Sequence, residues 1–416
     1  MSDRPVIVEA LRTPIGRQGG ALREVRAAEL AAPVLAELQG RLARLAPGVH
    51  PTAGPRTAGE AACPDEVILG NCMGPGGDVA RVAALAAGLP VAVPGLTVDR
   101  QCGSGLAAVV VAADQVAARG GIVLAGGVES PSTAPWRYWP PTGDARDQPP
   151  THGTPMRGTP MRDAPMRDAP TRYTRAPFAP DGQPDPEMGE AADALAATYG
   201  IGRADQDAYA ARSHARAVAT AAAGGFDGEI VPVGTLSRDE RPSPRLTAER
   251  LARLTPAFGP HGTVTTGNSC GINDGAAAVT VVDGHRAETA RLPGLEIVAT
   301  ATAGVPTDRP GFGIVPATEQ ALDHAGLTLD DVEVIEFNEA FAGQVLACCA
   351  ALRLDPARVC PQGGALALGH PWGASGAVLL VRLFSQLVRT PRPGAYGLAA
   401  IAVGGGQGVA MVVRSC

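Results

Sequence analysis

The stretch from residue 96 to residue 127 constrains the fold of this chain more than any other. Residues 96–99 include two β-branched side chains, as at the end of a strand, and residues 106–116 are apolar at helical spacing. Residues 121–127 form a second apolar run that ends in two glycines. A strand, a turn, a helix and a strand in this order favour parallel strands with helices on both faces of the sheet.

Cys102 lies in the turn of this unit, directly before the helix. The free N–H groups and partial positive charge of a helix N-terminus favour a thiolate over a thiol. Gly103 and Gly105 permit a sharp turn and the close approach of a ligand. The arrangement is typical of an activated nucleophile on a strand-to-helix turn. The alternative is a buried cysteine without chemical function, which is equally common at a helix start.

The same alternation continues along the chain, which predicts an α/β fold with a mainly parallel sheet covered on both faces. Residues 47–64 are rich in proline, glycine and alanine and predict a surface insertion. Apolar runs predict strands over 5–10, 67–72, 229–233, 273–282, 295–303, 332–337 and 397–404. Helical spacing predicts helices over 27–45, 79–88, 189–199, 203–223 and 316–325, and a further helix after His370.

Residues 131–186 interrupt this pattern. They are rich in proline, arginine and threonine, and residues 154–173 contain a five-residue near-repeat with proline in each copy. Proline at every fifth position excludes a helix and indicates an extended loop. The loop is either a tolerated surface expansion, which we favour, or a basic arm that binds phosphate or a partner.

Composition excludes several classes of function. The net charge is −6 and all basic residues are arginines without a basic block, so nucleic acid is not an expected partner. The first residues lead directly into a strand, and we find neither a signal peptide nor an apolar run that predicts a membrane span. Eight cysteines without CxxC spacing argue against zinc and against a disulfide framework. We therefore expect a cytoplasmic protein with no metal site.

The C-terminal third repeats the arrangement around Cys102. His370 precedes a glycine-rich helix start, and an apolar run ending in Gly404-Gly-Gly406 follows, which suggests two similar α/β halves. Asn338 follows another predicted strand. A histidine beside a cysteine nucleophile accepts its proton, and an asparagine positions a water or an oxyanion. Together, Cys102, His370 and Asn338 form a more specific signal than any one of them.

These segments identify the chain as similar to the thiolase family over nearly its whole length, except 47–64 and 131–180. The matching pieces are Glu9-Ala-Leu-Arg-Thr-Pro14, Asp65-Glu-Val-Ile-Leu-Gly70, Cys102-Gly-Ser-Gly105, Gly126-Gly-Val-Glu-Ser130, Gly267-Asn268, Asn273-Asp-Gly-Ala276, Asn338-Glu-Ala-Phe341, Gly363-Gly-Ala365, Gly369-His-Pro371 and Gly404-Gly-Gly406.

The resemblance implies two α/β/α halves stacked as five layers, with a loop domain. The N-terminal half would comprise 1–130 and 264–285, the loop domain 131–263 and the C-terminal half 286–416. The resemblance also implies a homodimer or homotetramer and an acyl-CoA substrate, with no separate cofactor.

The resemblance further implies residue roles. Cys102 would carry the acyl group, and His370 would activate it. Asn338 would hold a water that lines one oxyanion hole with His370, and the backbone N–H groups of Cys102 and Gly404 would line the other. The residues expected along the coenzyme A channel are Met188, Phe258, Cys270, Ala340 and Phe341.

The chain departs from the family pattern at Ala402. Thiolases carry a second cysteine there, which removes or returns the α-proton of the second acyl-CoA. Alanine has no proton to exchange, and the loss of a positioned base costs about 10²–10⁴ in rate. Cys270 stands where serine is usual, and Glu187 where histidine is frequent. Cys270 or Cys360 would be a substitute thiol.

Three functions remain open on these residues. The first is an acyltransferase that acylates Cys102 and passes the group to a malonyl-type carbanion or a heteroatom nucleophile, with weak thiolysis remaining. The second is a conventional acetyl-CoA acetyltransferase with a substitute base. The third is a non-catalytic scaffold or coenzyme A-binding relative, against which the intact Cys102, His370 and Asn338 argue.

Overall fold

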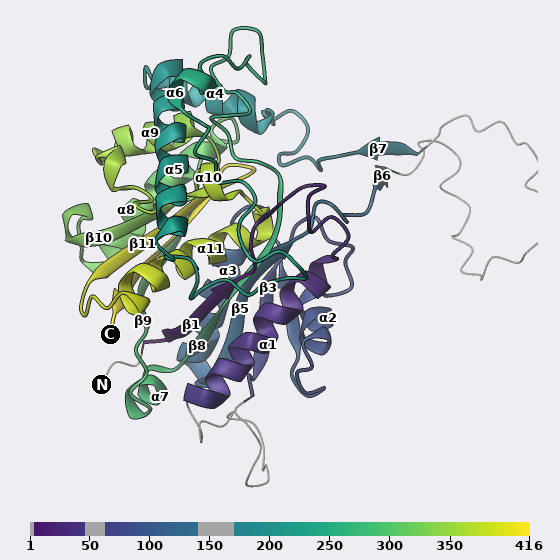
Figure 1. Ribbon diagram of the computed structural model, residues 1–416, viewed down its shortest axis with the longest axis vertical. Helices are drawn as coiled ribbons and strands as arrows, with labels where there is room; N and C mark the ends of the chain where they lie inside the picture. Colours follow the sequence, from purple (N-terminus) through teal and green to yellow (C-terminus); the bar gives the residue numbers. More distant parts are fainter. Residues whose placement is uncertain (1–3, 46–62, 140–169) are drawn as a thin grey trace, which may run out of the picture.

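The computed structural model describes residues 4–45, 63–139 and 170–416 (Figure 1). Its strands lie in two groups. The first group has the order β4-β3-β5-β8-β1. In chain order these strands are β1 (Val6–Arg12), β3 (Glu66–Gly70), β4 (Gly95–Val98), β5 (Ile122–Glu129) and β8 (Asn273–Val282).

The second group has the order β10-β11-β12-β9. Its members are β9 (Leu295–Gly304), β10 (Val332–Phe337), β11 (Tyr396–Val403) and β12 (Gln407–Ser415). A parallel bridge between Ile335 and Val359 extends this group on the far side of β10. The two groups join where Val6 and Ile7 of β1 pair with the start of β9.

Helices occupy three layers around these sheets, and Figure 1 shows α3 (Ser104–Arg119) and α11 (Trp372–Phe384) in the middle. Their apolar side chains share one core with residues of both sheets. The outer face of the first sheet packs on α1 (Ala27–Leu45) and α2 (Val79–Ala86). The outer face of the second packs on α8 (Ile314–Ala325) and α9 (Ala342–Leu352). The predicted five layers and two α/β/α halves are therefore confirmed.

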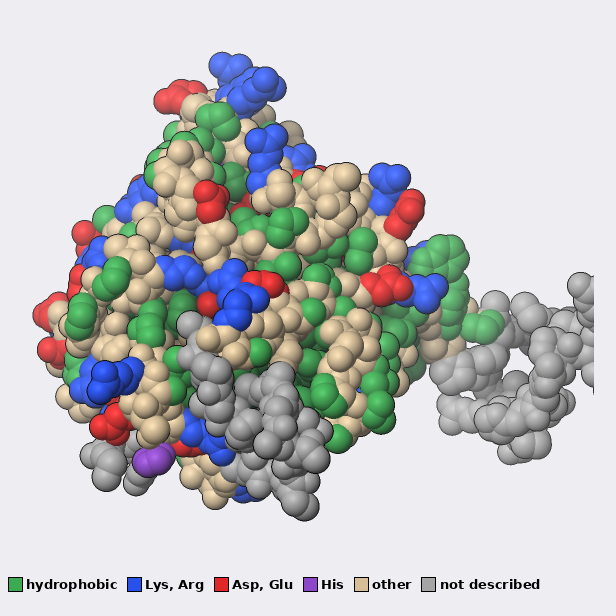
Figure 2. Space-filling model, turned by 60° about the horizontal axis from the view of Figure 1, so that its bottom comes forward, with side chains coloured by type: hydrophobic (Ala, Val, Ile, Leu, Met, Phe, Trp, Pro, Cys, Tyr) green, Lys and Arg blue, Asp and Glu red, His purple; other side chains and the backbone are tan. Residues whose placement is uncertain are grey.

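The segment between β5 and β8 carries α4 (Met188–Thr198), α5 (Arg203–Ala222) and α6 (Ala248–Leu251). A hairpin of β6 (Arg137–Trp139) and β7 (Thr171–Tyr173) projects from it (Figure 1). Trp139 stacks on Tyr173 with 4.7 Å between ring centroids, and hydrophobic side chains gather at this projection in Figure 2. The remaining short elements are β2 (Gly16–Arg17), α7 (Gly284–Thr289) and α10 (Ala365–Leu368).

Two predictions about strands were wrong. The sheet is mixed rather than mainly parallel, because β8 is antiparallel to β1 and β5, and β12 is antiparallel to β9 and β11. The chain reaches β12 through a tight glycine turn, and a hairpin can only join antiparallel strands. Residues 229–233 form no strand but only single bridges at Ile230 and Val233. The other predicted strands and helices are present, with ends shifted by a few residues.

Some predictions fall outside the described residues. These are most of the insertion at 47–64 and most of the proline-rich repeat, of which only residues 170–173 are described.

One described helix, residues 101–119, has the length and apolar composition to cross a membrane. Leu106 and Val109 of this helix are fully buried in the central core. Its apolar character is thus explained by packing inside the fold.

Candidate active site

Cys102 lies between β4 and α3, on a turn with unusual backbone geometry. Gln101 has φ = +44°, a conformation that non-glycine residues rarely adopt. The Ser104 hydroxyl donates to the Gln101 carbonyl oxygen at 2.6 Å and accepts from the Arg100 N–H at 2.8 Å. These bonds hold the strained turn that presents Cys102 in front of α3.

The thiol of Cys102 lies against its own backbone N–H and that of Gly404. Both N–H groups lower the pKa of the thiol, but burial is the larger effect and raises that pKa to about 12. The two N–H groups act in the predicted direction, but desolvation outweighs them. Cys102 needs a base to become a nucleophile.

His370 is a buried, neutral imidazole. Burial lowers the pKa of His370 to about 4. Its Nδ1 lies 2.6 Å from the Ser375 hydroxyl, and its backbone N–H donates to Asn273 Oδ1 at 3.1 Å. Since Ser375 occupies Nδ1, Nε2 is the nitrogen free for proton transfer. A neutral imidazole oriented in this way is suited to act as a general base.

Glycines bring the starts of α3 and α11 together. A Cβ at Gly105 would lie 2.7 Å from the Gly373 carbonyl oxygen, and one at Gly376 would overlap the Leu106 backbone nitrogen. Cys102 lies two residues before the first helix and His370 two residues before the second. This crossing places the candidate nucleophile and the candidate base, from distant parts of the chain, at the same end of the central layer.

Asn338 follows β10 and is 2% exposed. Its backbone N–H donates to the Ala400 carbonyl oxygen at 2.9 Å, which fixes it beside β11. Asn338 also lines a cavity of about 10 Å³ together with Gly369 and Ser375. This volume is about the least that one water requires. The predicted water-holding role has room here and stays a prediction.

Gly404 and Ala402 lie at the end of β11. The ring of Phe178 covers Gly404, since a Cβ there would be 2.7 Å from Phe178 Cε2. Arg175 lies 4.6 Å from the centroid of the same ring. Ala402 pairs with Gly408 of β12, and its methyl group is half-buried on the outer core. Because the side chain of residue 402 is a methyl group, it has no atom that could accept or donate a proton.

The five predicted channel residues form one continuous surface. Phe258 packs on the backbone of Gly189, next to Met188, and meets Phe341 edge to face at 6.2 Å. The Cys270 N–H donates to the Ala340 carbonyl oxygen at 2.9 Å.

Burial is the larger cause of the raised pKa of the Cys270 thiol, and Cys102 contributes to it. The thiol of Cys360 instead points at the Phe337 carbonyl oxygen, 3.2 Å away in the outer core, which removes it as a substitute base at Cys102.

Sequence reasoning missed several residues at this site. Ser375 lies five residues after His370, in the first turn and a half of α11, and its contact with the ring required the folded turn before that helix. Phe178 had no signal, because only the folded loop brings it onto Gly404. Cys72 donates to Glu129 Oε2 at 2.9 Å, and its pKa is raised well above the usual value by burial, Glu129 and also Cys102.

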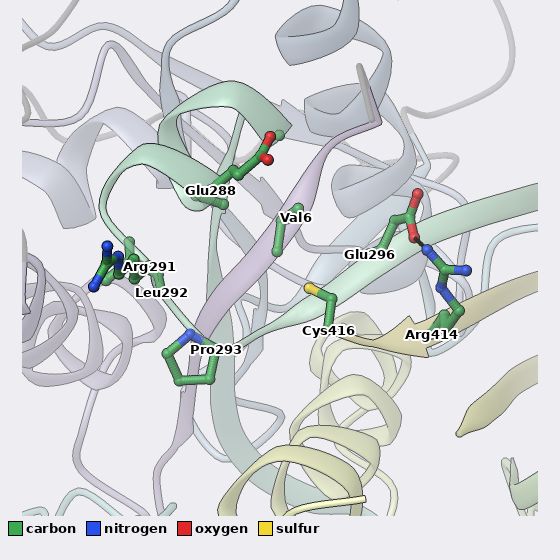
Figure 3. A pocket seen from close by; sticks show the side chains of 10 residues that line it. Val6, Glu288, Arg291, Leu292, Pro293, Glu296, Arg414 and Cys416 are labelled. Atoms are coloured by element: carbon green, nitrogen blue, oxygen red, sulfur yellow. Dashed lines mark hydrogen bonds and ion pairs between the residues drawn. The ribbon is translucent and has the colours of Figure 1, made fainter. Parts of the chain in front are cut away.

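A further cavity lies at the opposite end of the sheets. It has a volume of about 590 Å³ and adjoins Cys416 and the start of β1 (Figure 3). Arg414 and Glu296 form an ion pair at 2.6 Å beside it. None of the predicted site residues lines it. Within the described ranges, no group of three or more histidine, cysteine, aspartate or glutamate side chains is arranged to hold a metal ion.

Comparison with known proteins agrees with this geometry. The sequence profile of the thiolase N-terminal domain matches residues 5–285, and that of the thiolase C-terminal domain matches residues 293–415. The chain is 40% identical to a beta-ketoadipyl-CoA thiolase of Escherichia coli, over 98% of each protein. It is also 40% identical to an acetyl-CoA acetyltransferase of Pseudomonas aeruginosa, with 98% of each covered.

The crystal structure of the Bacillus anthracis acetyl-CoA acetyltransferase superposes with a TM-score of 0.81 at 36% identity, covering 100% of this chain and 99% of that one. Both domain profiles, the full-length relatives and the five-layer fold agree. The chain belongs to the thiolase family and is an acyltransferase of that family.

Proposed function

We propose that this protein takes acyl groups from coenzyme A thioesters onto Cys102 and passes them to a second substrate. The observation that carries this proposal is the Cys102 thiol held on two backbone N–H groups, with the neutral His370 at the adjacent helix start. The coenzyme A thioester is then substrate, and no separate cofactor is required.

The acylation step follows from these groups. His370 removes the proton from Cys102 Sγ, which attacks the thioester carbonyl carbon. The N–H groups of Cys102 and Gly404 stabilise the oxyanion that forms. The carbon–sulfur bond to coenzyme A then breaks, and the departing thiolate takes the proton from His370. The acyl group remains on Cys102.

The second substrate is where Ala402 matters. Without a base at residue 402, the acceptor that fits best is one that needs no α-proton removal. Decarboxylation of a malonyl-type thioester generates a carbanion without a base. A heteroatom nucleophile attacks through its own lone pair and requires no α-proton removal. Asn338 and His370 would stabilise the enolate oxygen of a malonyl-type acceptor.

A second candidate is an acetyl-CoA acetyltransferase with a substitute base. Cys270 favours it, because this thiol is in electrostatic range of Cys102 and adjoins Ala340 in the channel. The pKa of Cys270 is raised to about 12 by burial, and Arg241 opposes that rise. Malonyl-CoA and acetyl-CoA as acceptors separate the two candidates, since only the first requires malonyl-CoA.

Intact-protein mass after brief exposure to acetyl-CoA tests the acyl-enzyme. We expect an added acetyl group on the parent and none on Cys102→Ala. No adduct on the parent, under conditions where coenzyme A binds, would contradict both candidates for acetyl donors and favour the binding role.

We also propose a homodimer or homotetramer in a reducing cytoplasm. Strand β4 is a sheet edge, and exposed apolar side chains surround it. A partner would cover such an edge and such a patch. The side chains are Val82, Leu85, Val91, Leu96 and Val111. All eight cysteines are free thiols, as in a reducing compartment.

A further inference from the structure

A cluster of basic side chains lies next to the channel residue Cys270. Arg241 and Arg17 both act electrostatically on His214, and Arg17 also acts on Arg241. A Cβ at Gly271 would overlap Arg241 Nη1 and lie 3.1 Å from Arg241 Nε, so the guanidinium abuts the backbone beside Cys270. Two guanidinium groups and an imidazole thus converge behind this part of the channel.

Arg17 is exposed and donates from Nη2 to the Glu240 carbonyl oxygen at 3.1 Å, whereas the other two side chains of the cluster have buried polar atoms without partners. His214 is 1% exposed, and in the described part of the chain neither ring nitrogen has a hydrogen-bond partner. Arg241 Nε is also buried without a partner among those residues. The two neighbouring carboxylates are engaged elsewhere. Asp239 binds Arg12 at 2.6 Å, and Glu240 accepts from the Arg17 backbone N–H at 2.8 Å.

Unpaired buried polar and charged groups are costly, typically by about 1–3 kcal/mol for each neutral group and more for a charged one. The acidic group that acts on Arg241 is the Cys270 thiol, and burial raises the pKa of that thiol, so it stays neutral. An oxyanion would satisfy the whole cluster, because guanidinium and imidazole N–H groups are its natural donors.

We propose that Arg241, His214 and Arg17 form an oxyanion-binding site that holds a phosphate or carboxylate group of the substrate. This inference rests on the proposed function, since it assumes that Cys270 lines the acyl-CoA channel. Two parts of a substrate carry the required chemistry. One is a phosphate of coenzyme A, and the other is a carboxylate at the far end of the acyl chain.

Equilibrium binding distinguishes these sources without requiring acylation. Cys102→Ala protein is titrated with acetyl-CoA and with succinyl-CoA, which adds one carboxylate, by calorimetry. The same titrations use Cys102→Ala with Arg241→Gln. The matched control is Arg245→Gln, which removes an exposed arginine from the same segment. Acylation of Cys102 is measured separately, so its failure does not affect this result.

If the site holds a coenzyme phosphate, Arg241→Gln raises the Kd of both ligands at least tenfold, and inorganic phosphate at constant ionic strength competes only when Arg241 is present. If the site holds an acyl carboxylate, Arg241→Gln raises the Kd at least tenfold for succinyl-CoA only. A change below twofold for both ligands would overturn the proposal, and so would an equal loss with Arg245→Gln. If Arg241→Gln fails to fold, His214→Gln is used in the same comparison.

Discussion

At the residue scale, the proposed mechanism makes the pKa of His370 decide the pH range in which Cys102 is activated. Only neutral imidazole accepts a proton, and burial lowers the pKa of His370 to about 4. His370 thus stays neutral down to about pH 5, whereas an unperturbed imidazole is protonated below about pH 6.5. We expect the acylation rate of Cys102 to change less than about twofold between about pH 5.5 and pH 8. Rapid-quench mass spectrometry measures the acylation rate. A tenfold fall of this rate per pH unit below about pH 6.5 would contradict a low pKa of His370.

Ala402 carries a second prediction at this scale. Ala402→Cys supplies a thiol where thiolases carry the base for the α-proton. Condensation of two acetyl-CoA molecules is expected to rise by about 10²–10⁴, the usual effect of a positioned base. Acylation of Cys102 should be unchanged. The coupled assay of coenzyme A release during condensation measures the gain, and Ala402→Ser is the matched control. An unchanged condensation rate would show that another group already serves as base.

At the element scale, the crossing of α3 and α11 depends on glycine. A Cβ at Gly376 would overlap the backbone nitrogen of Leu106, and backbone cannot yield as a flexible side chain does. Gly376→Ala should therefore push the helices apart and destabilise the fold by about 1–3 kcal/mol, as overpacking does. Urea unfolding measures the loss. The control is Gly40→Ala in α1, where a Cβ meets its nearest atom at 3.5 Å.

The same variant tests the site. Because the crossing aligns the turns before α3 and α11, Gly376→Ala should slow acylation of Cys102 even where the protein is fully folded. Full acylation activity together with lost stability would mean that the turns keep their positions independently of the crossing.

At the scale of the whole molecule, Glu229 connects three parts of the chain. It is fully buried and bonds Arg12 of β1 at 2.7 Å, Arg382 of α11 and the Ser385 hydroxyl. Glu229→Ala leaves two buried guanidinium groups short of a counter-charge, and we expect a loss of about 3–5 kcal/mol of stability. Glu24→Ala, in an exposed pair with Arg23, is the control and should cost about 0–1 kcal/mol.

The pH dependence of this ion cluster has a definite sign. Arg382 and Arg12 lower the pKa of Glu229 in the folded protein, although burial opposes them. The contribution of the Glu229 carboxylate to stability is fully present above the usual carboxyl pKa. It is lost as the pH falls through the lower pKa that Glu229 has in the folded protein. The stability difference between the parent and Glu229→Ala, measured by urea unfolding, should therefore shrink on acidification. A constant difference would contradict the ion-pair origin.

The exposed edge at β4 carries the last prediction. Val91 is 78% exposed and Leu96 is 39% exposed, which a partner would explain. Leu96→Lys places a charge at the edge, and charged residues on an edge strand prevent pairing. Light scattering should report at least a dimer for the parent and a smaller species for the variant. A monomeric parent would refute the oligomer.

The sequence alone determined most local structure and the family, and it singled out the candidate reacting groups. Helix α1 was predicted over its observed range, because its apolar residues recur at helical spacing along the whole run. The glycines around Cys102 and His370 marked both helix starts, since only tight turns and close approaches require them. The family followed from these local segments and from their order.

Only the tertiary structure decided what those groups are chemically. Burial leaves the Cys102 thiol protonated and the His370 imidazole neutral, and burial depends on the whole fold rather than on neighbouring residues. The contact of Phe178 with Gly404 joins two distant segments that share no sequence pattern. The antiparallel course of β8 likewise depended on where the chain returns to the sheet. Local periodicity specifies elements, whereas their partners, solvation and charge balance are properties of the packed molecule.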